Sequence, residues 1–166
     1  MKPTDSLKPA SPARRVLIGA AGAWGAVQLL PGSALAQVPA PFNPNELPPI
    51  PAMEEFLAGR RVQFTRMQMD IPRVADNGNS VSLKLGVLGA TTPGAVQSIH
   101  LFSEKNPVPR MAVFRFSPQS ARFDIESRVR LAGTQRVVAI ATLANGALHA
   151  KVSEVLVAIA ACLDGA

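Results

Sequence analysis

The chain has 166 residues, which is room for one domain, and 48% of them are hydrophobic while 17% are charged. This balance excludes a fully disordered protein. The net charge of +6 falls to +3 without residues 1–36, which hold four of the 17 basic residues and one of the 11 acidic residues. The remaining chain has no basic run beyond the pair Arg60-Arg61, so a clustered phosphate-binding surface, and with it a nucleic-acid partner, is not expected.

Residues 1–36 have the pattern of a cleaved export signal. The pair Arg14-Arg15 precedes an apolar stretch at 16–30, whose length of about 15 residues is too short to span a bilayer, so no permanent membrane anchor is expected. The small residues that follow predict cleavage after Ala36. The two arginines predict export by the twin-arginine route to the periplasm; an ordinary secretory signal that contains two arginines is the alternative.

A linker and a short helix are predicted next. Residues 37–51 include six prolines, which fix the backbone and remove hydrogen-bond donors, so this segment is expected to be an extended linker. The sequence AMEEFLAG at 52–59 predicts a short helix that ends at its glycine. Met53, Phe56 and Leu57 fall on one face of this helix and can pack against a sheet.

From residue 60 onward the pattern is that of β-strands. The clearest is VSLKLGV at 81–87, where apolar residues alternate with Ser, Lys and Gly. Asn145-Gly146 predicts a tight hairpin between the last two strands. The other strand-like runs are at 64–71, 97–102, 111–116, 121–132, 136–143 and 147–160. About seven strands with no long helix between them predict an all-β domain over 52–159, an antiparallel β-sandwich of immunoglobulin-like size.

Few residues of this domain suggest catalysis or metal binding. His100 and His149 are far apart in sequence and lie in strand-like runs among apolar neighbours, so a structural role is favoured over a metal site. The carboxylates are scattered, and no two can be paired for acid–base chemistry: Asp70, Asp76, Asp124 and Glu126. A self-contained enzyme, a metal site and a cofactor are therefore not expected.

The single cysteine, Cys162, lies in the C-terminal tail at 160–166. In an exported protein an unpaired cysteine suggests an intermolecular bond or a reactive thiol. A small, buried, inert residue is the alternative, because free cysteine is often buried. Cys162 falls on the opposite face, or beyond the strand, if the core-facing residues of the last strand are Val155, Val157, Ile159 and Ala161.

Three blocks of sequence resemble a known family. They are VADNGNSV at 74–81, SIHLFSEKNPVPRMAVFRFSP at 98–118 and RVRLAGTQRVVAIA at 128–141, and the likeness extends over about residues 54–162. In their order and spacing they are similar to SoxY, the sulfur-carrier subunit of the bacterial sulfur-oxidising (Sox) system. The resemblance implies an immunoglobulin-like sandwich that pairs with a SoxZ subunit and visits other Sox enzymes in turn. It also implies that Cys162 is the attachment point for thiosulfate-derived sulfur, in a carrier that is not itself the catalyst.

The tail departs from the family pattern. The family's cysteine is typically flanked by glycines, whereas here the sequence is AACLDGA at 160–166. Alanine restricts the backbone more than glycine does, and Asp164 disfavours a nearby thiolate. If the last strand ends at Ile159, three residues extend Cys162 by at most roughly 10 Å. The alternative function is a β-sandwich interaction module in which the cysteine is incidental.

Overall fold

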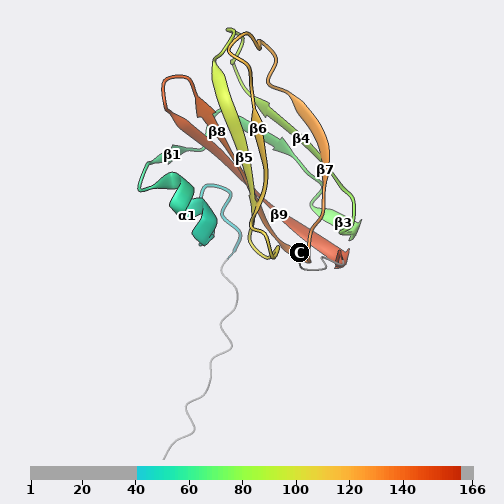
Figure 1. Cartoon of the computed structure of the whole chain (residues 1–166). Coiled ribbons are helices and arrows are strands. Elements are labelled where there is room, and N and C mark those ends of the chain that lie inside the picture. The colour runs from blue at the N-terminus through green and yellow to red at the C-terminus, as the bar shows by residue number, and fades with distance from the viewer. Residues whose placement is uncertain (1–40, 162–166) are drawn as a thin grey trace, which may run out of the picture. The chain divides into compact units, whose positions relative to one another are not determined.

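The computed structural model describes residues 41–161, which form one helix and nine strands (Figure 1). The elements are α1 (Pro51–Leu57), β1 (Val62–Gln63), β2 (Met67–Asp70), β3 (Val74–Asn77), β4 (Val81–Val87), β5 (Val96–Ser103), β6 (Arg110–Arg115), β7 (Ile125–Val129), β8 (Gln135–Leu143) and β9 (Leu148–Ile159). The predicted signal at 1–36, with Arg14, Arg15 and the cleavage site, lies outside the described residues, and so does Cys162. Within 41–161, no helix is long and apolar enough to cross a membrane.

The strands form two sheets, which confirms the predicted all-β sandwich. The larger sheet has the order β1-β9-β8-β5-β6, and β3 also pairs with β9; the smaller sheet has the order β2-β4-β7. At the predicted hairpin between β8 and β9, Gly146 has a φ of 81°, which glycine adopts without steric penalty.

Two strand pairs differ from the predicted antiparallel arrangement. The short strands β1 and β3 run parallel to β9, with Val62 opposite Leu148 and Val74 opposite Leu156. Both lie on the edge of β9 that β8 leaves free, and in Figure 1 β3 lies beside the C-terminal end of β9. These pairings join segments far apart in the chain, so local alternation does not reveal them.

The main core lies between the two sheets. The predicted alternation of β4 is confirmed, because Val81, Leu83, Leu85 and Val87 are all buried in this core. They pack against residues from the larger sheet such as Ile99. The hydrophobic effect therefore holds the two sheets together and fixes which face of each strand points inward.

A second, smaller core lies between α1 and the other face of the larger sheet. Strand β8 contributes to both cores: Val137 is part of the main core, and Val138 is part of the core under the helix. The helix begins at Pro51, one residue before the predicted start, because proline suits the first helical position. Its predicted apolar face is confirmed for Met53, which is 1% exposed, and Ile50 of the predicted linker is buried beside it.

Candidate functional site

The segment that leads to Cys162 is the end of β9. The strand ends at Ile159. In the arrangement considered for its core-facing residues, Val155 is buried, but Ile159 is 63% exposed. Two residues later the chain returns to the domain, and Ala161 is only 7% exposed.

Three backbone hydrogen bonds hold this returning segment. The N–H of Gly78 donates to the carbonyl of Ile159 over 2.8 Å, and the N–H of Leu131 donates to the carbonyl of Gly78 over 2.8 Å. The N–H of Ala161 then donates to the carbonyl of Leu131 over 3.0 Å. We call these four residues, Gly78, Leu131, Ile159 and Ala161, the arm anchor. They join the β3–β4 turn, the segment after β7 and the end of β9.

The side chain of Asn106 supports the anchor from the β5–β6 loop. Its Nδ2 donates to the carbonyl of Arg130 over 2.9 Å, and its Oδ1 accepts the N–H of Ala132 over 3.0 Å. The two bonds bracket Leu131 in the chain. The same Oδ1 accepts from Nε2 of the buried Gln135 over 2.9 Å, so the Asn106 amide is held in one orientation.

An ion pair links the same β5–β6 loop to β8. Glu104 accepts hydrogen bonds from Nη2 and Nε of Arg136 at 2.7 and 3.0 Å, the two-point geometry that favours an arginine–carboxylate pair. Both side chains are half-buried, at 26% and 31% exposure, so water screens the pair only in part. The hydrogen bonds from Arg136 lower the pKa of Glu104.

We expect Glu104→Gln to lower the free energy of unfolding by about 1 kcal/mol at pH 7. Because the carboxyl pKa is lower in the folded state, the stabilisation is present above the unfolded pKa of about 4.3 and is lost as the pH falls through the folded value. Urea unfolding at pH 7 and pH 3 measures this difference. The control is Glu126→Gln, whose pair with Lys84 is solvent-exposed and whose loss should leave stability nearly unchanged. Equal effects of both variants would contradict this account.

The two histidines lie far from Ile159, where β9 ends. His149 is ten residues before Ile159 on the same strand, which is about 33 Å along an extended chain. His100 is paired through Ile140 to Ala150, at nearly the same level of the sheet. Burial lowers the pKa of both, so they are neutral at pH 7. Their predicted structural environment fits the contacts: His100 stacks on Phe56 at 4.1 Å, and Nδ1 of His149 lies 3.2 Å from Oγ1 of Thr65.

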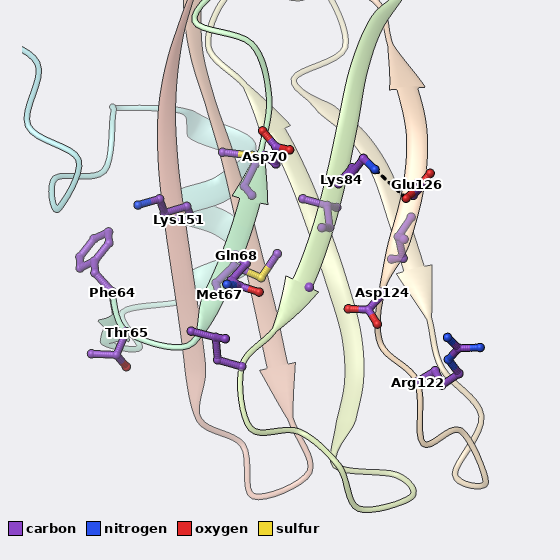
Figure 2. Close-up of a pocket in the computed structure, with 15 residues that line it drawn as sticks. Phe64, Thr65, Met67, Gln68, Asp70, Lys84, Arg122, Asp124, Glu126 and Lys151 are labelled. Atoms are coloured by element: carbon purple, nitrogen blue, oxygen red, sulfur yellow. Dashed lines mark hydrogen bonds and ion pairs between the residues drawn. The ribbon is translucent and has the colours of Figure 1, made fainter.

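An open groove of about 770 Å³ lies beside the smaller sheet (Figure 2). It brings together three of the predicted carboxylates, Asp70, Asp124 and Glu126, but Asp76 does not line it. Lys84 bonds Glu126 at 2.8 Å, and this bond raises the pKa of Lys84, which therefore stays protonated and cannot act as a base. In residues 41–161 no cluster of three or more His, Cys, Asp or Glu side chains that could hold a metal ion is found.

Exposed apolar side chains lie on both faces of the paired strands β3 and β9, because Leu156 and Ile159 are three residues apart on one strand. Of the large hydrophobic residues that are exposed, three lie on β3 and β9: Val74 at 61%, Leu156 at 49% and Ile159 at 63%. Val74 and Leu156 are opposite each other in the paired strands. Sequence reasoning missed this surface, because the apolar residues of β9 follow one alternating pattern whether or not a second sheet covers them.

Comparison with solved structures supports the fold alone. The chain is similar to two forms of superoxide reductase (neelaredoxin) from Ignicoccus hospitalis, each with 15% identity and a TM-score of 0.50. These matches cover 64% and 63% of this chain and 91% and 86% of the others. A putative superoxide reductase from Thermotoga maritima has 12% identity and a TM-score of 0.46, covering 55% of this chain and 84% of that one. No curated protein matches significantly.

The family comparison is more specific. The model of the family described as sulfur oxidation protein SoxY matches residues 53–162. This match covers most of the chain, and the chain therefore belongs to the SoxY family, with a role in sulfur oxidation within the Sox system.

Proposed function

We propose that this chain is a carrier of sulfur intermediates, which are bound covalently to the thiol of Cys162. The observation that carries this proposal is the extent of the family match, which runs to residue 162, so that its last residue is the only cysteine of the chain. The anchor geometry agrees with it, since β9 and the arm anchor give the chain a fixed position up to Ala161, the residue before that cysteine.

The chemistry assigns separate tasks to the carrier and to its partner enzymes. Joining thiosulfate to a thiol forms one S–S bond and releases one proton and two electrons, so a partner redox enzyme must accept the electrons. A thiol with an unperturbed pKa near 8.5 is only about 3% ionised at pH 7. His100 and His149 lie far from Ile159, where β9 ends, so the loading enzyme also supplies the base. The chain thus acts as a substrate-bearing subunit and not as the catalyst.

The partners and the location follow from the same proposal. The chain forms a heterodimer with a SoxZ-like subunit and meets the other Sox enzymes transiently. The segment 1–36, with Arg14 and Arg15, exports it to the periplasm and is removed after Ala36. Thiosulfate outside the cytoplasm is then directly accessible to the complex.

The test is intact-mass spectrometry of the mature chain with its SoxZ-like partner, after incubation with thiosulfate and the other Sox enzymes. We expect a mass gain that a reductant reverses and that is absent in Cys162→Ser. The same gain in both proteins would place the sulfur elsewhere, and no gain in either would exclude carriage.

An interaction module in which the cysteine is incidental is the second candidate. Two observations favour it: the alanine-rich tail in place of glycine, and the exposed apolar residues Val74 and Leu156, which are opposite each other in paired strands. Exposed apolar groups near one another are typical of a surface that binds protein. If this candidate is correct, Cys162→Ser leaves both partner binding and sulfur oxidation intact, whereas the carrier proposal predicts that only binding survives.

A further inference from the structure

Gly78 is needed at the arm anchor because of close approach, not because of its backbone angles. Its φ is outside the left-handed region that favours glycine. A Cβ at this position would lie 2.3 Å from the carbonyl oxygen of Leu131 and 2.9 Å from the backbone nitrogen of Ala161. Both are backbone atoms, so no side-chain rotation relieves the clash. Only glycine allows the three segments to meet.

Ala161 is buried, although the two residues before it are exposed. Ile159 and Ala160 are exposed, whereas Ala161 is 7% exposed and its N–H is hydrogen-bonded to Leu131. Burial of the methyl group and the hydrogen bond act together on one residue. The chain is therefore fixed immediately before Cys162, and not only at the end of β9.

The partner of Ala161 is itself fixed by a side chain. Asn106 holds Leu131 from both sides, through the carbonyl of Arg130 and the N–H of Ala132. The three blocks that carry the family resemblance meet here: 74–81 supplies Gly78, 98–118 supplies Asn106 and 128–141 supplies Leu131. Segments far apart in the sequence thus converge on the peptide that receives Ala161.

We propose that Asn106 is a positioning residue for Cys162: it fixes Leu131, and Leu131 holds Ala161, the residue before the cysteine. The hydrogen bonds define the arm anchor, whereas its role in presenting the thiol rests on the proposed carrier function. Because Ala161 is held, the Cα of Cys162 lies about 4 Å from the Cα of Ala161, a fixed point. The limit of at most roughly 10 Å was counted from Ile159, and the hydrogen bond that holds Ala161 shortens this limit.

Because the chain is held at Ala161, the partner enzyme has to approach the thiol. A long glycine arm can enter a recessed active site, but a thiol one residue from an anchored alanine cannot extend far from the domain. The enzyme that loads Cys162 must therefore contact the surface around the anchor. That surface includes the exposed side chain of Ile159.

Amide hydrogen exchange, measured by NMR on the ¹⁵N-labelled mature chain, tests the anchor. In the wild-type protein we expect the Ala161 amide to exchange at least about tenfold more slowly than an unstructured amide. Gly78→Ala should remove this protection but leave that of Ala150, in the middle of β9, unchanged. The matched control is Gly86→Ala, where the added Cβ would meet only side-chain oxygens, of Asp124 at 3.0 Å and of Gln68 at 3.6 Å. An unprotected Ala161 amide in the wild-type protein overturns the proposal, even if Gly78→Ala does not fold.

A pair of substitutions tests Asn106. Asn106→Ala removes both bonds to the Leu131 segment, and we expect about tenfold faster exchange at Ala161 and Ala132. Asn106→Asp keeps the acceptor for Ala132 but not the donor to Arg130, so an intermediate rate is expected at Ala161. A merely structural role would raise exchange equally at Ala150, and that result would contradict a positioning role.

The exchange experiment needs no sulfur chemistry, so it separates this inference from the proposed function. An unprotected Ala161 amide overturns the anchored arm even if Cys162 takes up sulfur. Conversely, a protected Ala161 amide with no sulfur adduct on Cys162 leaves the anchor in place and overturns the carrier function.

Discussion

Cys162→Ser is expected to abolish thiosulfate-dependent electron transfer in a system reconstituted from this chain, a SoxZ-like partner and the other Sox enzymes. Serine is close in size to cysteine, but its hydroxyl does not form a stable bond to sulfur under these conditions. The chain has no second cysteine to take over the task. The expected loss is therefore complete, and the rate of reduction of the electron acceptor measures it.

Two controls separate lost chemistry from lost structure. Cys162→Ser should keep the thermal midpoint of the wild-type chain, because the substitution lies beyond Ala161, the last residue held by the anchor. It should also bind the SoxZ-like partner with unchanged affinity. An unchanged rate of electron transfer in the serine variant would contradict the carrier proposal and favour the interaction module.

Leu131→Ala is expected to lower the free energy of unfolding by about 2–5 kcal/mol, the largest stability effect that we predict. Leu131 is 0% exposed and belongs to the core between the two sheets, so truncation leaves a cavity in addition to the lost burial. Its backbone also receives Ala161 in the arm anchor. Chemical denaturation of the mature chain measures the loss.

The matched control for this prediction is Leu156→Ala. It removes the same atoms from a side chain that is 49% exposed, so a much smaller loss of stability is expected. Equal losses in the two variants would show that burial in the core does not explain the effect of Leu131→Ala. If Leu131→Ala also unfolds the anchor locally, the Ala161 amide becomes unprotected at denaturant concentrations where Ala150 remains protected.

Local patterns were sufficient to predict the sandwich. The alternation at 81–87 identifies the buried face of β4, and Asn145-Gly146 marks the turn between β8 and β9. The short helix and its apolar face follow from the position of Met53. In each case the information lies within a few neighbouring residues, because a strand or helix has one repeating geometry.

The arm anchor could not be predicted, because it depends on contacts between distant segments. Gly78 resembles an ordinary turn glycine until Leu131 and Ala161 are placed against it. Asn106 lies in a proline-rich loop, where its hydrogen bonds to the Leu131 segment leave no trace in the local pattern. The exposure of Ile159 depends on which strand lies opposite, and alternation alone does not contain this information.

Peptide mapping of the protein isolated from thiosulfate-grown cells shows directly whether sulfur is bound to Cys162. Cleavage after Lys151 releases the segment 152–166, which contains Cys162 and no other cysteine. If Cys162 carries sulfur, we expect this peptide to have a sulfur adduct that is lost on reduction. A peptide that is always unmodified, in cells that are actively oxidising thiosulfate, would contradict it.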